Sequence, residues 1–328
     1  MAALMSIFKN ELNDYLAIRQ KTMTPESHYR THTILAGFDR YLSDVCLAEK
    51  VVTEKIINGW INRFSATNSR KTVSDKVSRL RKFLEYLLHC GYTVFMPGCP
   101  KYSDEYVPYI FSDAEVAGIF EAADNLRVVP GHPSTRYLKY TFPMLLRLLH
   151  GCGLRLGETL SLRVRDVNFK NGTLLLRHTK NNKQRLVPMH RELTEILRRY
   201  CAAMMLVGKP DEFLFPTDSP EKPLPQASAR NAFGKALACA GVNVKIPGRR
   251  GPCLHCFRHL FAIKSFAQAE NNGRAPDASV PFLSVYLGHY DMNGTEKYLK
   301  FSGDMFPRHT EMFETFAVGV FSEVPDEV

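Results

Sequence analysis

The chain has 328 residues, 45% of them hydrophobic, which is enough for one large core or two ordinary ones. A formal net charge of +10 favours an acidic partner such as nucleic acid, although a basic housekeeping enzyme has the same composition. No apolar run is long enough to cross a membrane, and the first residues do not resemble a signal peptide. We therefore expect a cytoplasmic protein without a membrane partner.

The eight cysteines are scattered, which excludes a disulfide framework in a chain of this length. Cys253 and Cys256 form one Cys-x-x-Cys pair around His255. A structural zinc site needs four ligands, and the sequence offers no second pair at a suitable spacing. We therefore predict no metal site.

The first hundred residues show helical periodicity. Helices are expected at about 8–19, 25–46, 53–64 and 69–90. The polar face of the last of these is strongly basic and holds few acids. Such a face is either ordinarily solvated or contacts phosphates, and we favour phosphate contact. The predicted DNA-contacting residues on it are Arg70, Lys71, Lys76, Arg79 and Lys82.

Residues 92–111 contain three prolines and little periodicity, so they are the best linker candidate. They divide the chain into a helical domain at 1–105 and a second domain at 106–328. Lys and Arg outnumber Asp and Glu by four in the first domain and by six in the second. Two basic domains suit a clamp around DNA better than a neutral scaffold with one basic tail.

The second domain is predicted to be mostly helical with one small β-hairpin. Ser112 and Glu115 form a capping box in front of its first helix. The two strands, 172–178 and 184–188, flank a polar turn. Residues 269–279 read as an extended loop. Helices are expected at about 113–123, 136–152, 158–162, 190–206, 226–240, 255–270, 280–288, 293–300 and 305–321.

Five polar features are spread along this second domain, and each has an ordinary structural explanation by itself. The residues are Arg155 in Gly-Leu-Arg, Lys180 in the hairpin turn, the pair His255 and Arg258, His289 after Leu-Gly, and Tyr298 nine residues later. Alone they would be a surface arginine, a solvated lysine, a polar pair, a helix cap and a packed tyrosine. Their order and spacing together argue against chance.

Residues 151–167, Gly-Cys-Gly-Leu-Arg-Leu-Gly-Glu-Thr-Leu-Ser-Leu-Arg-Val-Arg-Asp-Val, resemble the first signature of the tyrosine recombinase (phage integrase) family. Residues 255–259 resemble its His-x-x-Arg box, and Leu287-Gly-His289 with Tyr298 resembles its last box. Lys180 matches the place of the family's mobile lysine. The resemblance covers roughly residues 110–300 and is closest to the compact two-domain type. The first domain is similar to the family's core-binding domain in length, helicity and charge alone.

The resemblance implies a site-specific recombinase that cuts DNA through a 3′-phosphotyrosyl link. Arg155 and Arg258 would hold the non-bridging phosphate oxygens while Tyr298 attacks phosphorus. His255 would accept a proton or orient the phosphate, and Lys180 would protonate the leaving oxygen. His289 would bond a phosphate oxygen. Glu158 would orient His255 or an arginine. The phosphotyrosyl link stores the bond energy, so no cofactor is expected.

Two further segments are predicted to take part in the same function. Arg249 and Arg250, in Gly-Arg-Arg-Gly before the His-x-x-Arg box, are predicted to contact DNA phosphate rather than form a plain surface loop. The terminal helix at 305–321 would dock on a neighbouring protomer or pack on its own domain. The implied partners are double-stranded DNA with specific core sites and further copies of the chain, as a tetramer on paired DNA.

Departures from the family pattern are small. Phe257 stands where leucine is usual, and the gap from Arg258 to His289 is longer than in compact members. Two alternatives remain open: a type IB topoisomerase-like enzyme, which the small first domain disfavours, and a catalytically silent DNA-binding protein, which the complete residue set disfavours.

Overall fold

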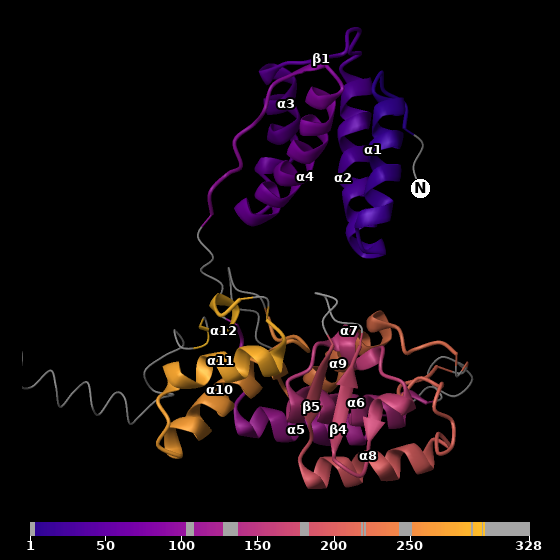
Figure 1. The fold of residues 1–328 in the computed structure, drawn as a ribbon, viewed down its shortest axis with the longest axis vertical. Coiled ribbons are helices and arrows are strands. Elements are labelled where there is room, and N and C mark those ends of the chain that lie inside the picture. The colour runs from indigo at the N-terminus through magenta and orange to yellow at the C-terminus, as the bar shows by residue number, and fades with distance from the viewer. Residues whose placement is uncertain are drawn as a thin grey trace, which may run out of the picture. The chain divides into compact units, whose positions relative to one another are not determined.

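The protein was examined as a computed structural model. It describes residues 4–102, 108–126, 137–177, 184–217, 219, 221–242, 251–289, 291–296 and 298. The chain forms two compact units, Met1–Glu105 and Tyr106–Val328 (Figure 1). Both are mainly helical with little strand, which confirms the predicted fold class. No described helix is both long and apolar enough to span a membrane.

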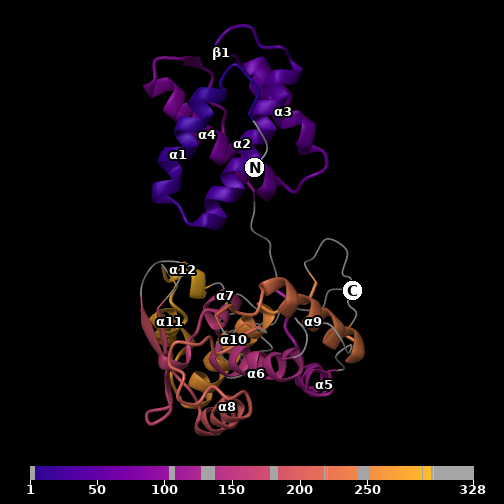
Figure 2. The same ribbon diagram turned by 90° about the vertical axis from the view of Figure 1, so that its right-hand side faces the viewer.

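The first unit is a bundle of four helices closed by a short parallel strand pair (Figure 2). Its described elements are α1 (Lys9–Thr22), α2 (Pro25–Asp44), β1 (Val51–Val52), α3 (Glu54–Ser65), α4 (Arg70–His89) and β2 (Thr93–Val94). Pro25 stands in the first turn of α2, where its missing N–H costs nothing. Thr53 precedes α3 as expected, but its side chain makes no capping bond.

The buried residues of α4 recur every three or four positions, and they face a shared core with α1, α2 and α3. Phe83 is packed edge-on against Tyr15, and Phe38 against Trp60. One side of α4 is buried in this core, so the basic residues of α4 lie on the opposite side and along both edges of the helix. The sequence did not predict the strand pair, because two residues per strand give no periodic signal.

The second unit packs helices around a three-stranded antiparallel sheet in the order β3-β4-β5. Its described elements are α5 (Asp113–Asp124), α6 (Leu138–Cys152), α7 (Leu156–Leu160), β3 (Val167–Asn168), β4 (Thr173–Leu176), β5 (Arg185–Pro188), α8 (Arg191–Ala203), α9 (Gln226–Cys239), α10 (Cys256–Asn271), α11 (Pro276–Leu287) and α12 (Asn293–Glu296). The capping box of Ser112 and Glu115 is present with both of its bonds, as predicted.

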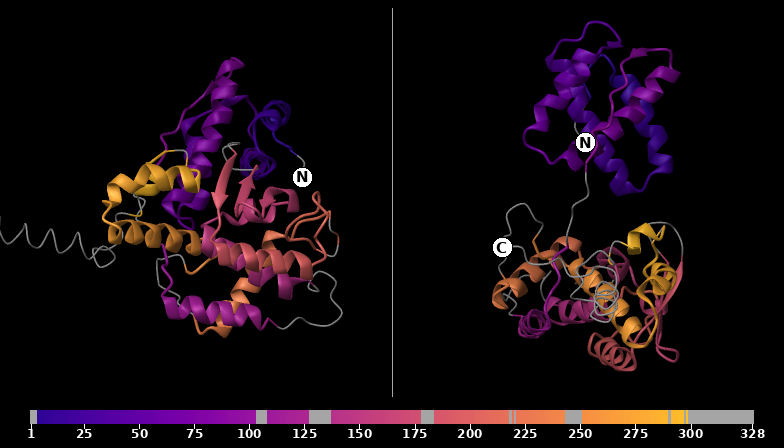
Figure 3. Two further views of the ribbon diagram at one scale, coloured as in Figure 1. Left: turned by 60° about the horizontal axis from the view of Figure 1, so that its bottom comes forward. Right: turned by 90° about the vertical axis from the view of Figure 1, so that its left-hand side faces the viewer.

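Helix α6 is the centre of this unit, and nine of its residues are buried although Pro143 lies within it. It contacts α5, α8 and α10, while α10 lies along α11, and α11 also contacts β5 (Figure 3). The end of α6, the start of α10 and the end of α11 are thereby brought together. These three helix ends hold most of the predicted catalytic residues.

The prediction of an extended loop at 269–279 is wrong. Helix α10 continues to Asn271 and α11 begins at Pro276, which leaves a short connection. Pro276 occupies the first turn of α11, where a fixed φ near −65° favours a helix start. Glu270 is buried, so the last turn of α10 is packed rather than frayed.

Candidate active site

The end of α6 is shaped by Gly153, which caps the helix with φ +59°. A Cβ at this position would come within 2.5 Å of the Phe261 ring, so both the left-handed backbone and the close approach require glycine. The chain then turns into α7, with Arg155 as the extended residue before that helix. The sequence Gly-Leu-Arg therefore places the first arginine at the mouth of the site.

Arg258 lies in the first turn of α10 and is 1% exposed. Its guanidinium donates to the carbonyl of Gly153 at 2.8 Å and to that of Leu287 at 2.7 Å. Burial, and next the charge of Arg155, lower the pKa of Arg258 to about 10, so it remains a cation at neutral pH. Two backbone carbonyls thus fix the plane of a buried guanidinium in one orientation.

Three consecutive carbonyls at the end of α11 each accept a hydrogen bond from a different arginine. Arg185 donates to Tyr286 at 2.9 Å, Arg258 to Leu287 at 2.7 Å and Arg155 to Gly288 at 3.2 Å. Carbonyls at a helix C-terminus lack helical partners and have partial negative charge. The end of α11 therefore gathers three cations from β5, α10 and the α6–α7 turn.

Glu158 is the carboxylate that these arginines share, and it is 5% exposed. Arg155 and Arg185 each donate to it at 2.7 Å. Burial raises the pKa of the carboxyl, but the hydrogen bond and charge of Arg185, followed by those of Arg155, outweigh burial and lower it overall. Glu158 therefore orients arginines. Among the described contacts of these arginines, Arg155 and Arg185 share one carboxylate and Arg258 adds a third cation nearby, an excess of positive charge that is suited to an anion.

His289 follows the capping glycine of α11 and connects Arg258 to α12. Its Nε2 lies 3.0 Å from Arg258 Nη2, and its Nδ1 lies 2.6 Å from the hydroxyl of Thr295. Burial, and next the charge of Arg258, lower the pKa of His289 to about 4, so the ring is neutral. A guanidinium can only donate, so Nε2 accepts and Nδ1 holds the hydrogen in this structure.

Tyr298 lies beside these groups and is 5% exposed. Its hydroxyl is 3.1 Å from Nδ1 of His259, and its ring is stacked 6.4 Å from that of His289, between centroids. Burial raises the pKa of Tyr298, while the charges of Arg258 and Arg155 oppose that rise. The phenol therefore holds its proton at neutral pH and needs help to become a nucleophile.

His255 precedes α10 and is exposed, with its ring 4.7 Å from that of His259, edge to face. The structure thus brings together Arg155, Glu158, Arg258, His289 and Tyr298, with His255 one ring away. Lys180, Arg249 and Arg250 lie outside the described residues, as does the terminal helix expected at 305–321. Sequence reasoning assigned no role to Arg185, His259 or Thr295. The one available signal was the second histidine of His-x-x-Arg-His, which is His259.

The basic residues of α4 that are predicted to contact DNA differ in the contacts that they already make within the protein. Arg70 and Lys82 are exposed, and Lys71 is exposed with its ammonium over the Tyr102 ring at 5.6 Å. Lys76 lies over the ring of Phe64 at 4.3 Å. Arg79 donates to the hydroxyl of Thr31 at 2.7 Å and pairs with Asp75, so it also holds α4 to α2.

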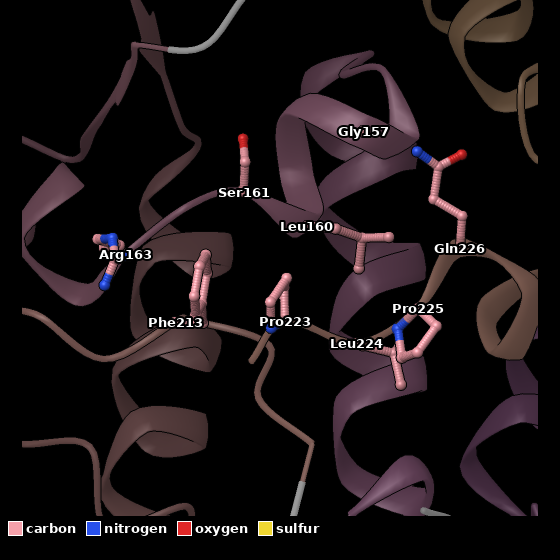
Figure 4. A pocket seen from close by; sticks show the side chains of 9 residues that line it. All are labelled: Gly157, Leu160, Ser161, Arg163, Phe213, Pro223, Leu224, Pro225 and Gln226. Atoms are coloured by element: carbon pink, nitrogen blue, oxygen red, sulfur yellow. The ribbon is translucent and has the colours of Figure 1, made fainter. Parts of the chain in front are cut away.

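A pocket of about 420 Å³ lies next to α7 but contains none of the predicted catalytic residues. In Figure 4, Ser161 and Gln226 extend toward the same side of it. The guanidinium of its one cation, Arg163, lies over the Phe213 ring at 4.2 Å. It is a shallow surface feature, and the arginine cluster is the better candidate for chemistry. The described residues include no cluster of three or more His, Cys, Asp or Glu that could hold a metal ion.

Comparison with known proteins gives a consistent result. The profile of the phage integrase family matches residues 112–303, more than half of the chain. The putative integrase/recombinase y4rE of Sinorhizobium fredii is 32% identical over 289 residues, covering 84% of this chain and 87% of that protein. The related y4rB of the same organism is 30% identical over 205 residues, a match that spans 60% of this chain and 63% of that relative.

The fold is also shared with solved structures. The XerH site-specific recombinase bound to palindromic difH substrate, in a post-cleavage complex, superposes with a TM-score of 0.69 at 18% identity. The match covers 93% of this chain and 87% of that one. A lambda integrase dimer bound to a COC′ core site gives a TM-score of 0.65 at 16% identity, over 88% of this chain and 76% of that one. The family profile and the match to y4rE show that the chain belongs to the phage integrase family, the tyrosine recombinases.

Proposed function

We propose that the protein is a site-specific DNA recombinase that cuts and rejoins strands through a 3′-phosphotyrosyl intermediate. The observation that supports it best is the position of Tyr298, a buried residue beside Arg258 and Arg155, in a cluster where Arg155 and Arg185 share the carboxylate of Glu158. The three arginines carry more positive charge than Glu158 offsets, and a DNA phosphodiester would balance the rest. The relatives named as integrase/recombinase and the recombinase–DNA complexes of the same fold support the same reaction.

In the proposed reaction, Arg155 and Arg258 bind the two non-bridging oxygens and stabilise the charge that develops on them. The Tyr298 oxygen forms a bond to phosphorus while the bond from phosphorus to the 5′-oxygen breaks. The phenol proton passes to His255, and Lys180 gives a proton to the 5′-oxygen. Religation is the reverse, with a 5′-hydroxyl as nucleophile.

His289 would change partners during this reaction. In the unliganded structure its Nε2 accepts from Arg258, so it has no hydrogen to offer a phosphate there. If Thr295 donates to Nδ1 instead, the ring hydrogen moves to Nε2, which can then donate to a phosphate oxygen. A phosphate oxygen beside Nε2 would favour this exchange, because it accepts the hydrogen that Nε2 then carries.

The first unit would add contacts to the duplex that do not depend on the DNA sequence. Lys71 and Lys82 are both exposed on α4 and are eleven residues apart, about three helical turns, so they project to the same side. Cations in such a row contact phosphates along one strand. The exposed Arg70 and the half-buried Lys76 flank that row. Arg249 and Arg250 would contact phosphate near the active site.

Recombination joins two duplexes, so we propose a tetramer on paired core sites, acting in the cytoplasm. A type IB topoisomerase would use the same chemistry without exchange between duplexes. A two-site assay with two selected duplexes separates these functions, because a recombinase yields hybrid products and a topoisomerase only relaxes supercoils. No described feature favours a silent DNA-binding protein.

The test of the chemistry begins with a binding site. The Tyr298→Phe variant is used to select duplexes from a random library, and the selected duplex is nicked near its centre so that the cut strand diffuses away. The wild-type chain is then expected to remain covalently attached, and Tyr298→Phe is not. Tyr200→Phe is the matched control, because Tyr200 is also a buried tyrosine. The absence of an adduct with wild type on duplexes that it binds would contradict the function.

A further inference from the structure

His259 follows Arg258 in the first turns of α10 and is 8% exposed. Its Nδ1 lies 3.1 Å from the Tyr298 hydroxyl, in a bond between side chains 39 positions apart in the chain. Both partners belong to the same chain. In this structure Tyr298 is therefore held beside the arginine cluster by a residue that the catalytic set does not include.

The ring of Tyr298 is fixed separately from its hydroxyl. It packs in a small apolar cluster with α10 and α11, formed by Ala262, Ile263, Phe266, Val280, Leu283 and Leu287. Packing of the ring alone leaves the hydroxyl oxygen of a tyrosine some freedom to shift. A hydrogen bond to that oxygen removes this freedom. The cluster and His259 together define where the oxygen lies.

This position places the Tyr298 oxygen on the side of the pocket where Arg258 and His289 lie. Arg258 is the next residue to His259 on α10, and His289 is stacked against the Tyr298 ring. A reacting oxygen that is displaced by about 1 Å can lose about a hundredfold in rate. A group that holds Tyr298 therefore has a direct effect on the cutting step without touching the phosphate.

Burial, and next the charge of His255, lower the pKa of His259 to about 3. The ring is thus neutral across the physiological range, and it is too weak a base to remove the phenol proton for good. A neutral ring nitrogen is suited to accepting a hydrogen bond from a protonated phenol. These properties favour positioning over proton transfer.

We propose that His259 is a positioning residue for the nucleophile, accepting the Tyr298 hydroxyl at Nδ1 and holding its oxygen beside Arg258 for in-line attack. This inference rests on the proposed function, since it assumes that Tyr298 is the nucleophile. The competing role is simple filling of a buried space next to His255. The two roles make opposite demands on the side chain at position 259.

Two substitutions separate these roles. His259→Asn retains a polar atom near the place of Nδ1 but is smaller, whereas His259→Phe retains the ring volume and has no hydrogen-bonding atom. Positioning predicts that His259→Asn forms the covalent adduct within about threefold of the wild-type rate. It predicts that His259→Phe is slower by about tenfold or more, the effect of one lost hydrogen bond or of a small displacement.

The assay measures single-turnover adduct formation by the full chain on the nicked duplex selected with Tyr298→Phe. DNA affinity is measured in parallel and should change by less than about twofold in both variants, because His259 is 8% exposed and is assigned no contact with the phosphate. Thermal unfolding reports whether each variant is folded. The expected signature is a slower cutting step at unchanged affinity, restored by asparagine.

The opposite order of rates, with His259→Phe active and His259→Asn slow, would show a filling role and overturn the proposal. Equal rates in the two variants, whether both normal or both slow, would overturn it as well. If either variant unfolds, His259→Gln replaces the asparagine and His259→Leu the phenylalanine, with the same expected order. A wild-type chain that binds the duplex and forms no adduct refutes the proposed function instead, so the two failures are distinct.

Discussion

Removing the charge of Glu158 is the most direct test of how the arginine cluster is held. Glu158→Gln keeps the volume of the side chain but leaves Arg155 and Arg185 without their shared counter-charge. The new amide also presents donors where both guanidiniums donate. We expect the second unit to lose about 3 kcal/mol of stability at pH 7.

The magnitude follows from the geometry. Two unit charges about 4 Å apart attract by about 4 kcal/mol at an effective dielectric constant of about 20. The pair of Glu158 and Arg185 has side chains that are 5% and 10% exposed, so water screens it little. Arg155 is 25% exposed and contributes less. Glutamine avoids the cost of burying a carboxylate, which offsets part of the loss.

The effect should depend on pH in a defined direction. The pKa of Glu158 is lowered in the folded protein from its ordinary value of 4.5, because the two arginines outweigh the effect of burial. A lowered folded-state pKa gives stability that is complete above the unfolded value and is lost as pH falls through the folded value. The difference between wild type and Glu158→Gln should therefore be largest above pH 4.5 and shrink below it.

Denaturant unfolding at several pH values checks both statements. Trp60 is the single tryptophan and lies in the first unit, so its fluorescence follows that unit and serves as an internal control. Hydrogen exchange of peptides from α7 and β5 follows the second unit. Glu195→Gln is the matched control, because Glu195 is 45% exposed in a surface pair and should cost at most about 0.5 kcal/mol. A loss below about 1 kcal/mol for Glu158→Gln, or one independent of pH, would refute this reasoning.

Three further outcomes are expected. Gly288→Ala should cost about 1–3 kcal/mol and slow adduct formation, because φ is +68° and a Cβ would come within 2.7 Å of an Arg185 nitrogen. Arg258→Lys should lower the single-turnover cutting rate at least about a hundredfold, since an ammonium cannot span two carbonyls and a phosphate as a planar fork does. Lys71→Gln with Lys82→Gln should weaken binding to all duplexes alike and flatten the plot of log affinity against log salt by about 2.

Each of these outcomes has a matched control. Gly208→Ala meets a φ of +80° with nothing within 4 Å of the added carbon, so it should show backbone strain without loss of cutting. Arg147→Lys changes a half-buried arginine that pairs with Asp124, outside the arginine cluster, and should leave cutting intact. Lys9→Gln with Lys21→Gln removes two exposed lysines from α1, and an equal change in salt dependence there would contradict a DNA-contacting face on α4.

The helices of this fold were predictable because their apolar periodicity and caps are local. Ser69 caps α4 through the N–H of Thr72, and the Ser112–Glu115 box opens α5, both at the expected positions. The two-residue strands and the start of α11 were not predictable in the same way. Their boundaries depend on pairing between distant segments and on burial of Glu270, neither of which leaves a periodic pattern.

The catalytic residues were predictable from the order and spacing of the motifs, but the groups that hold them were not. Arg185 belongs to a strand, and nothing in its neighbourhood indicates that it binds Glu158 and the carbonyl of Tyr286. His259 lies next to a motif residue, yet its contact with Tyr298 spans 39 positions. Many of the hydrogen bonds that hold the arginines are accepted by backbone carbonyls at the end of α11. Any residue type provides a carbonyl, so the sequence does not reveal these bonds.

The arginines that we propose to bind the phosphate also lower the pKa of the neighbouring histidines and so keep them neutral. Burial lowers the pKa of His259 and of His289 first, and the charge of Arg258 lowers both further. A phosphodiester bound at the cluster would cancel part of that charge and let both pKa values rise. A higher pKa makes a ring nitrogen a stronger hydrogen-bond acceptor, so His259 would hold the Tyr298 hydroxyl more firmly when substrate is present. At Tyr298 burial outweighs the charges of Arg258 and Arg155, so the hydroxyl keeps its proton before DNA arrives, and occupancy of the anion site then improves how that hydroxyl is held for cutting.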